Sequence, residues 1–504
     1  MLLNMSRKKK ELKEDSKRIK KALAEGKIGI AEPMKWPFMC DLMRFCEKVD
    51  VIKILNSASG DFKRKSISLV GKFLLIYIIR LFVGITNTRG IKELIEDYGV
   101  MTLLGFKHVE IKHGITKRGK SNQYGRKFSR KAGTMDAFTI INNIAKFSLE
   151  IVIECHSSIV KNLVKLGVKF GQVYALDSTI VHTKNDYPGA GKTSRKDKED
   201  CKSSPPVTIW GFKLFILYDI KTRIPVSMVI VSAEKADCKY LLSLVKKGEE
   251  NLGKGKIKVV VADRGFIDGN AMWKLKYEMK IDFIIPAKSS MIVWEDAISF
   301  REAAQKAKLI ESWKYAKGQS GGFMVPGLRS YSDYNKESAK SKKYRNGCPI
   351  NAVVVTIWRD MQIAVGKEKV LLTSLTGNSA VEIIQKYRLR SFIENCGFRE
   401  LKQAALLSRL PKRKGKGTET SAYIHIALCV ITTTIFYGFI YWRKLRRRSK
   451  AQIKTDPIHM REFRKQTKCK PNAIFVLYER YYAILTLDEL LAAAGIEQTH
   501  KIKK

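Results

Sequence analysis

An α/β fold with a mixed central sheet is predicted for the middle of this chain, with a helical, basic module before it. Three observations predict it. Short apolar strands alternate with helical segments between residues 171 and 287, a strand-like stretch interrupts them from 288 to 373, and a long amphipathic segment then returns. Alternation of strands and helices favours a sheet with helices on its faces.

The strands of the α/β region are indicated by runs of β-branched and aromatic residues. They are expected at residues 173–176, 210–220, 224–233, 257–262 and 281–287, with helices at 235–251 and 267–279. After the insertion, residues 379–408 have the periodicity of one long amphipathic helix. The expected regions are a helical basic N-terminal part (1–170), the first part of the α/β domain (171–287), a β-rich insertion (288–373), the second part of that domain (374–442) and a basic C-terminal part (443–504).

Charge is the outstanding feature of the composition. The chain has 95 Lys and Arg against 48 Asp and Glu, a formal net charge of +47. Such an excess repels itself unless a polyanion is nearby, and nucleic acid is the commonest such partner. A Gly-rich basic stretch at Gly114–Gly133 has the composition of a loop that contacts phosphates. We therefore expect a DNA-binding protein.

The cysteines indicate a reducing compartment. Nine are present, and no two of them form a C-x-x-C pair. This argues against a zinc site or a disulfide framework. The charged segment Met1–Lys21 has no apolar signal-peptide core. A cytoplasmic, nucleoid-associated location is expected.

One apolar run, Ala422–Trp442, is long enough to cross a membrane and is followed by basic residues. Its histidine, three consecutive threonines and β-branched centre also suit a buried helix of a large domain. We favour the buried helix, and a membrane partner is not expected.

Two predicted strands end in an aspartate, Asp177 and Asp263. Carboxylates at the carboxyl ends of neighbouring strands lie where open α/β sheets bind ligands. They repel each other unless a cation lies between them. Mg²⁺ or Mn²⁺ prefers such oxygen ligands. Glu394, on the predicted long helix, would complete a site for two ions.

The helix that carries Glu394 also carries Tyr387 and Arg390, at spacings that place all three on one face. Arg offers two-point contacts to phosphate, and Tyr offers a hydrogen bond or a stacking surface. Each acid has an ordinary alternative role in a turn, a helix cap or a solvated face. Asp219 and Asp268 are alternative acids for the site, and His182 is a conceivable neighbour of the metal.

The segments ALDST at Asp177, ADRGF at Asp263 and YRLRSFIENCGFRELKQ at Glu394 resemble the DDE transposases of prokaryotic insertion sequences. The resemblance is to the branch with a tyrosine–arginine–glutamate–lysine signature and a ribonuclease H-like domain split by a β-rich insertion. It covers about residues 95–440 and includes LLGF, at Leu103–Phe106, near its start.

The resemblance implies cleavage at transposon ends with two Mg²⁺ or Mn²⁺ ions, then transfer of the freed 3′-hydroxyl strand into target DNA. By it, Asp177, Asp263 and Glu394 hold the metals, and Tyr387, Arg390 and Lys402 contact DNA. Arg264, beside Asp263, is a further candidate for a DNA contact or for an ion pair with the acids. The implied partners are double-stranded DNA, as terminal repeats and target, and a second copy of the chain in a synaptic complex.

One spacing departs from the family signature. The family's lysine usually follows the glutamate by seven residues, but here Leu401 occupies that position and Lys402 follows by eight. On a regular helix Lys402 would lie roughly 80° from the face of Glu394. A one-residue π-bulge at Gly397 would restore the register.

Three other functions remain compatible with the sequence. The chain could be a catalytically inactive DNA-binding protein derived from a transposase, a membrane-attached basic protein, or a related nuclease that cuts DNA without joining it.

Overall fold

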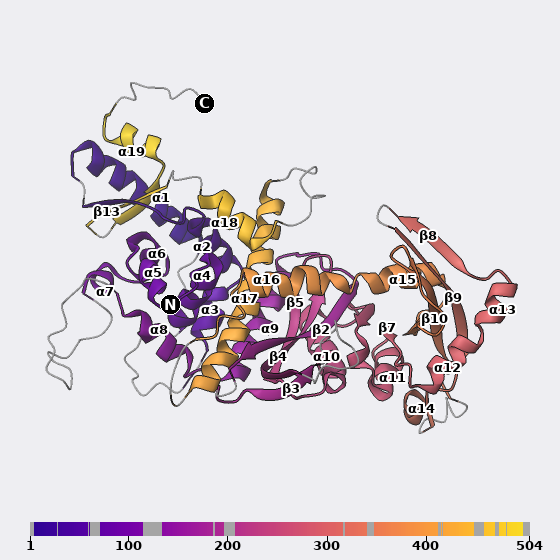
Figure 1. Ribbon diagram of the computed structural model, residues 1–504. Coiled ribbons are helices and arrows are strands. Elements are labelled where there is room, and N and C mark those ends of the chain that lie inside the picture. The colour runs from indigo at the N-terminus through magenta and orange to yellow at the C-terminus, as the bar shows by residue number, and fades with distance from the viewer. Residues whose placement is uncertain are drawn as a thin grey trace. The chain divides into compact units, whose positions relative to one another are not determined.

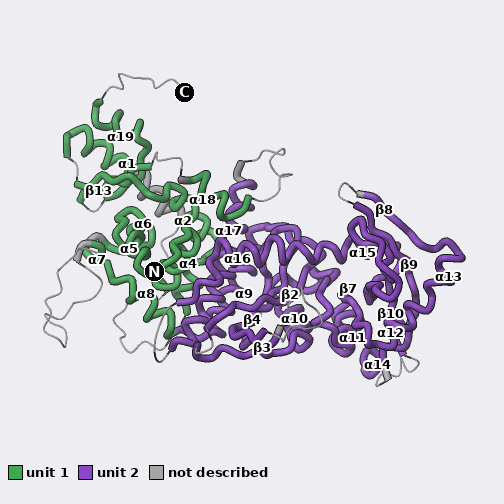
Figure 2. The backbone as a smooth tube through the Cα atoms, in the orientation of Figure 1, with its two compact units in different colours: residues 1–146, 458–504 green, residues 147–457 purple. Residues whose placement is uncertain are grey.

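The computed structural model describes residues 5–27, 29–58, 60, 71–113, 134–184, 187–195, 207–315, 318–339, 347–411, 415, 417–447, 458–468, 473–479 and 481–496. The predicted phosphate-contacting loop at Gly114–Gly133 lies outside these residues. The chain forms two compact units, and the first combines both ends of the chain (Figure 2). Unit 1 contains residues 1–146 and 458–504, and unit 2 contains residues 147–457.

Unit 1 is mostly helical and has one small sheet (Figure 1). Its strands are β1 (Ile30–Pro33), β13 (Ile474–Tyr478) and β14 (Tyr481–Leu485). Its helices are α1 (Met5–Ala24), α2 (Met39–Lys48), α3 (Val51–Asn56), α4 (Gly71–Val83), η1 (Arg89–Ile91), α5 (Lys92–Ile95), α6 (Tyr98–Leu103), α7 (His108–His113), α8 (Ala137–Ile144), α18 (Met460–Lys468) and α19 (Leu487–Ala493).

The C-terminal segment supplies the central strand of this sheet. Strand β13 pairs antiparallel with β1 on one side and with β14 on the other. Helix α1 packs on the sheet through Ile19 and Leu23, which are buried against Val476. Arg464 of α18 donates hydrogen bonds to the carbonyl oxygens of Leu81 and Phe82, at the end of α4. The two ends of the chain therefore share one core.

Unit 2 is built on a five-stranded core sheet in the order β5–β4–β2–β6–β7. Strands β2, β4 and β5 are antiparallel neighbours, whereas β6 and β7 join β2 in parallel. This order and these directions are those of a ribonuclease H-like fold, as the sequence predicts. The strands are β2 (Val173–Thr183), β3 (Gly191–Arg195), β4 (Val207–Asp219), β5 (Pro225–Ser232), β6 (Val259–Ala262) and β7 (Asp282–Pro286), and β3 pairs with the start of β4.

The helices of unit 2 cover the core sheet. Side chains of α10 and α11 form one hydrophobic cluster with Leu176, Phe215 and Val260. Helix α17 packs against α9, α16 and β5. The helices are α9 (Leu149–Lys165), η2 (Asp237–Tyr240), α10 (Leu241–Leu252), η3 (Arg264–Phe266), α11 (Gly269–Tyr277), α15 (Ala380–Arg388), the π-helix η5 (Ile393–Phe398), α16 (Arg399–Gln403) and α17 (Thr418–Arg447).

The insertion continues the core sheet. Strand β12 pairs antiparallel with β7, and the order continues through β10 and β9 to β8, which gives an 11-stranded sheet. Three short helices accompany these strands. The elements are α12 (Ile292–Ser299), α13 (Arg301–Lys306), β8 (Glu311–Tyr315), β9 (Gly318–Leu328), α14 (Ser332–Ala339), β10 (Ile350–Trp358), β11 (Met361–Gln362) and β12 (Lys369–Thr373).

The structure differs from the sequence expectations at three places. Strand β2 does not end at Asp177, because residues up to Thr183 continue to pair with β4. The helix expected at 379–408 is broken into α15, η5 and α16, and residues Leu389 and Arg390 lie in a turn. Helix α9, which the sequence division places with the N-terminal part, belongs to unit 2.

The apolar run Ala422–Trp442 lies within α17. This helix is long and apolar enough to cross a membrane, but 94 % of its most apolar window is buried inside the protein. The Nε2 atom of His425 lies 3.1 Å from the carbonyl oxygen of Leu406, and the hydroxyls of Thr432 and Thr433 donate to carbonyls one turn earlier. His425, Thr432 and Thr433 thus find partners inside a packed core, as buried polar side chains require.

A charged residue in strand β13 is expected to unfold unit 1. Val476 is 1 % exposed, so Val476→Asp would bury an unpaired carboxylate and cost more than about 3 kcal/mol. Leu487→Asp is the matched control, because Leu487 is 46 % exposed in the first turn of α19. Thermal unfolding and limited proteolysis should show early loss of residues 1–146 in the first variant only. Equal stability of the two variants would contradict the shared core.

Candidate active site

Asp177 and Asp263 lie next to each other because of the strand pairing. In the parallel pair β2–β6, Leu176 is opposite Ala262, so the next residue on each strand is an aspartate. Side chains alternate across a sheet, and Leu176 and Ala262 belong to the cluster with α10 and α11. Both aspartates therefore point to the opposite face.

Each aspartate is held by the residue that follows it. The backbone N–H of Ser178 donates to Asp177 Oδ1 at 2.7 Å, and the N–H of Arg264 donates to Asp263 Oδ1 at 2.8 Å. These short contacts fix the direction of both carboxylates without using their remaining oxygens.

Glu394 reaches the same place through the π-helix η5. The sequence predicts a π-bulge at Gly397, and the π-helix Ile393–Phe398 confirms it. A Cβ atom at Gly397 would lie 3.2 Å from the Tyr218 ring, so glycine permits the close approach of this helix to β4. By ideal helix geometry, one extra residue in the turn would place Lys402 within roughly 20° of the face of Glu394. Lys402 is exposed, as a DNA contact requires.

Arg390 joins two of the three acids. Its Nη1 atom donates to Asp177 Oδ2 at 2.9 Å and to Glu394 Oε1 at 2.8 Å. The Asp177 side chain is 12 % exposed and that of Glu394 is 51 % exposed. Arg390 therefore links Glu394 to a buried aspartate on the sheet.

Burial and like charges dominate the electrostatics of Asp177. The pKa of Asp177 is raised from an ordinary value of 3.8 to about 7, mainly by burial and also by the carboxylates of Asp263 and Glu394. The Arg390 guanidinium and the N–H of Ser178 act in the opposite direction. Burial also raises the pKa of Tyr387 to about 12, so the phenol stays protonated. An anionic cluster of this kind is stabilised by any added cation.

The three acids have the chemistry of a divalent-cation site. Their oxygens are hard donors of the kind that Mg²⁺ and Mn²⁺ prefer. Within the described ranges, however, no three His, Cys, Asp or Glu side chains are arranged to hold a metal ion. In this structure the Arg390 guanidinium supplies the positive charge between Asp177 and Glu394. The donors fit a metal, and Glu394 would have to exchange its guanidinium partner for it.

The alternative acids have structural roles. Asp219 is fully buried and accepts hydrogen bonds from the N–H groups of Gly171 and Thr222 and from the Thr222 hydroxyl. Asp268 caps helix α11 by accepting from the N–H of Ala271. His182 is exposed near the end of β2, five residues after Asp177. Arg264, which follows Asp263, is exposed to solvent.

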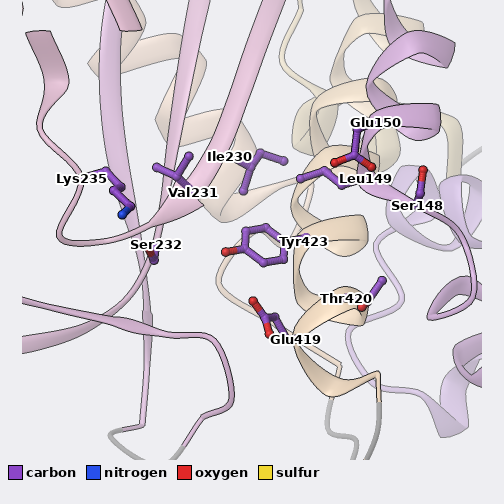
Figure 3. Close-up of a pocket in the computed structure, with 10 residues that line it drawn as sticks. All are labelled: Ser148, Leu149, Glu150, Ile230, Val231, Ser232, Lys235, Glu419, Thr420 and Tyr423. Carbon is purple, nitrogen blue, oxygen red and sulfur yellow. The ribbon is translucent and has the colours of Figure 1, made fainter. Parts of the chain in front are cut away.

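A pocket of about 510 Å³ lies elsewhere in unit 2 and contains none of these residues. It is lined by the first turns of α9 and α17 and by the end of β5 (Figure 3). Glu150 and Glu419 both line it, so its charge does not suit an anionic substrate.

Comparisons with known proteins found a matching family and a similar solved structure. A sequence model of the family described as "Transposase DDE domain" matches residues 169–431, more than half of the chain. This range contains Asp177, Asp263 and Glu394. A solved synaptic complex of piggyBac transposase with hairpin DNA is similar, with a TM-score of 0.41 and 11 % identity over 94 % of this chain and 86 % of that chain. No curated protein matches the chain.

Metal-free protein is expected to lose stability as the pH rises from about 4 to about 7. The folded pKa of Asp177 lies above its ordinary value, so the folded state holds an additional proton in this window. That contribution is complete below pH 4 and is lost as the pH passes the folded pKa. Asp177→Asn should flatten this part of the curve, measured by thermal unfolding in EDTA.

Asp333→Asn is the control for that experiment, because the Asp333 side chain is 58 % exposed. Parallel pH curves for wild type and Asp177→Asn would show that Asp177 titrates normally.

Proposed function

This chain belongs to the transposase DDE domain family, and we propose that it is a transposase of a prokaryotic insertion sequence. The family consists of metal-dependent, DNA-cleaving enzymes. The proposed reaction is cleavage at the ends of the element, followed by transfer of the freed 3′-hydroxyl strand into target DNA. The observation that carries the proposal is the convergence of Asp177, Glu394 and Arg390 beside Asp263.

Asp177, Asp263 and Glu394 would hold two Mg²⁺ or Mn²⁺ ions. When bound, such ions activate the attacking oxygen and stabilise the leaving one in a phosphodiester displacement. The sheet supplies the rigidity that this requires, since Asp177 lies within β2, Asp263 directly follows β6, and each accepts a hydrogen bond from the next backbone N–H. The third acid comes from a separate element and is the one exposed residue of the three, since Asp177 is buried and Asp263 is half-buried.

Arg390 would exchange partners when DNA binds. In the protein alone its guanidinium neutralises Asp177 and Glu394. A phosphate offers the same two-point geometry as a carboxylate. The Arg390 guanidinium would therefore bind a DNA phosphate when the acids bind the metal ions. Tyr387, 7 % exposed and protonated, would donate its hydroxyl beside Arg390. Lys402 and Arg264 would contact phosphates farther along the backbone.

The proposed partners are the terminal repeats of the element, the target DNA and a second copy of the chain. The net charge of +47 supports a long path of phosphate contacts. We assign recognition of the repeats to the basic unit 1 and catalysis to unit 2. A homodimer follows from the need to hold two ends in one synaptic complex. Because the proposed substrate is DNA of a bacterial cell, the proposed location is the cytoplasm, in association with the nucleoid.

The acids are tested by cleavage and strand-transfer assays on DNA that carries the ends of the element. Asp177→Asn, Asp263→Asn and Glu394→Gln should each reduce cleavage by more than about 100-fold, because each removes a metal ligand, while DNA binding is retained. Glu302→Gln, an exposed change in the insertion, is the control. Binding without cutting by wild type would favour the inactive DNA-binding protein. Cutting without joining would favour a nuclease.

The register of Lys402 is tested by the salt dependence of DNA binding. If Lys402 contacts one phosphate, Lys402→Gln should lower the slope of log affinity against log salt by about one. Lys306→Gln removes an exposed lysine of α13 and should leave the slope unchanged. Identical slopes for wild type and Lys402→Gln would remove Lys402 from the DNA contacts.

A further inference from the structure

A charged network lies under the active site, on the face of the sheet opposite to the three acids. Asp237, in η2, accepts a hydrogen bond from Lys213 at 2.8 Å through Oδ1 and from the Ser178 hydroxyl at 3.1 Å through Oδ2. Lys213 also donates to the carbonyl oxygen of Lys235 at 2.8 Å. The side chains of Lys213 and Asp237 are 13 % and 24 % exposed. This pair is therefore largely shielded from solvent, where its geometry is better defined than that of a surface pair.

The network reaches Asp177 through Ser178. The Ser178 side chain lies on the α10 face of β2, opposite Phe215, and is held there by Asp237. Its backbone N–H is the donor to Asp177 Oδ1. One residue thus connects Asp237 on one face of the sheet to the catalytic carboxylate on the other.

Asp237 also lies against the turn that follows Asp263. Helix η2 packs against η3, which begins directly after Asp263. A Cβ atom at Gly265 would lie 3.1 Å from Asp237 Oδ2, closer than side chains normally pack. Glycine in the ADRGF segment therefore leaves room for Asp237. The preceding N–H, of Arg264, is the donor to Asp263 Oδ1.

We propose that Asp237 is a positioning residue that fixes Asp177 and Asp263 relative to each other. Its carboxylate contacts the residue after Asp177 and lies against the turn after Asp263, and Lys213 holds that carboxylate in place. The role rests on the proposed function, because it matters only if the two acids act together. Asp237 itself touches neither acid and lies on the other face of the sheet, so it is not a catalytic residue.

Ser178 offers a matched pair of variants. Threonine and valine have the same shape and both suit a strand, but only threonine keeps the hydroxyl that Asp237 accepts. Ser178→Val should lower kcat for cleavage of element-end DNA by about 10- to 100-fold with an unchanged KM, as losses of supporting contacts do. Ser178→Thr should restore most of the rate. Asp237→Asn, which keeps the shape and loses the charge on Lys213's partner, should resemble Ser178→Val.

Hydrogen exchange gives a second measurement that does not depend on catalysis. In metal-free full-length protein, Asp237→Asn should speed exchange at the Arg264 amide, which donates to Asp263, while amides in the middle of β6 keep their protection. Equal cleavage rates for the threonine and valine variants would overturn the proposal, as would unchanged exchange at Arg264. If wild type does not cleave DNA, the proposed function fails, and the exchange at Arg264 still decides whether Asp237 positions this turn.

Discussion

Parallel pairing of β2 with β6 creates the constraint on which unit 2 depends, because it places two carboxylates at neighbouring positions on a buried sheet. Because Leu176 pairs with Ala262, the two aspartates that follow them lie side by side and share one environment. Burial and the two nearby acids raise the pKa of Asp177 to about 7. Ionised carboxylates that are buried so close together repel each other, and a positive charge between them offsets this repulsion. In the protein alone that charge is the Arg390 guanidinium, and in the proposed reaction it is a metal ion.

The turn and the π-helix after the insertion bring Arg390 and Glu394 to the two aspartates. Arg390 lies in a turn and Glu394 in a π-helix, so neither sits on the regular helix that their spacing suggests. Irregular turns of this kind are less stable than an α-helix and tend to persist at functional sites. Here the gain is geometric. The π-helix packs against Tyr218 at Gly397 and brings Glu394 to Arg390.

Unit 1 shows that the ends of the chain are one structural element. The central strand β13 comes from the last fifty residues, whereas β1 and α1 come from the first. The N-terminal part cannot complete its sheet until the whole chain is made. The proposed recognition of DNA ends and the proposed catalysis are therefore properties of units whose chain segments are interleaved, with unit 2 inserted between the two parts of unit 1.

The sequence by itself determined the local features, namely the strands that lead into both aspartates and the spacing of Tyr387, Arg390 and Glu394. These depend on periodicity and on single positions, which are readable in one dimension. Only the tertiary structure decided which strands pair. It extended β2 past Asp177 through the polar residues up to Thr183, because β4 supplies their hydrogen bonds. It also placed β13 beside β1, and Asp237 beneath Ser178 and Gly265. Contacts between residues far apart in the chain cannot be read from a local sequence pattern. Each contact depends on where the distant partner lies in the folded chain, and not on the residues next to it in sequence.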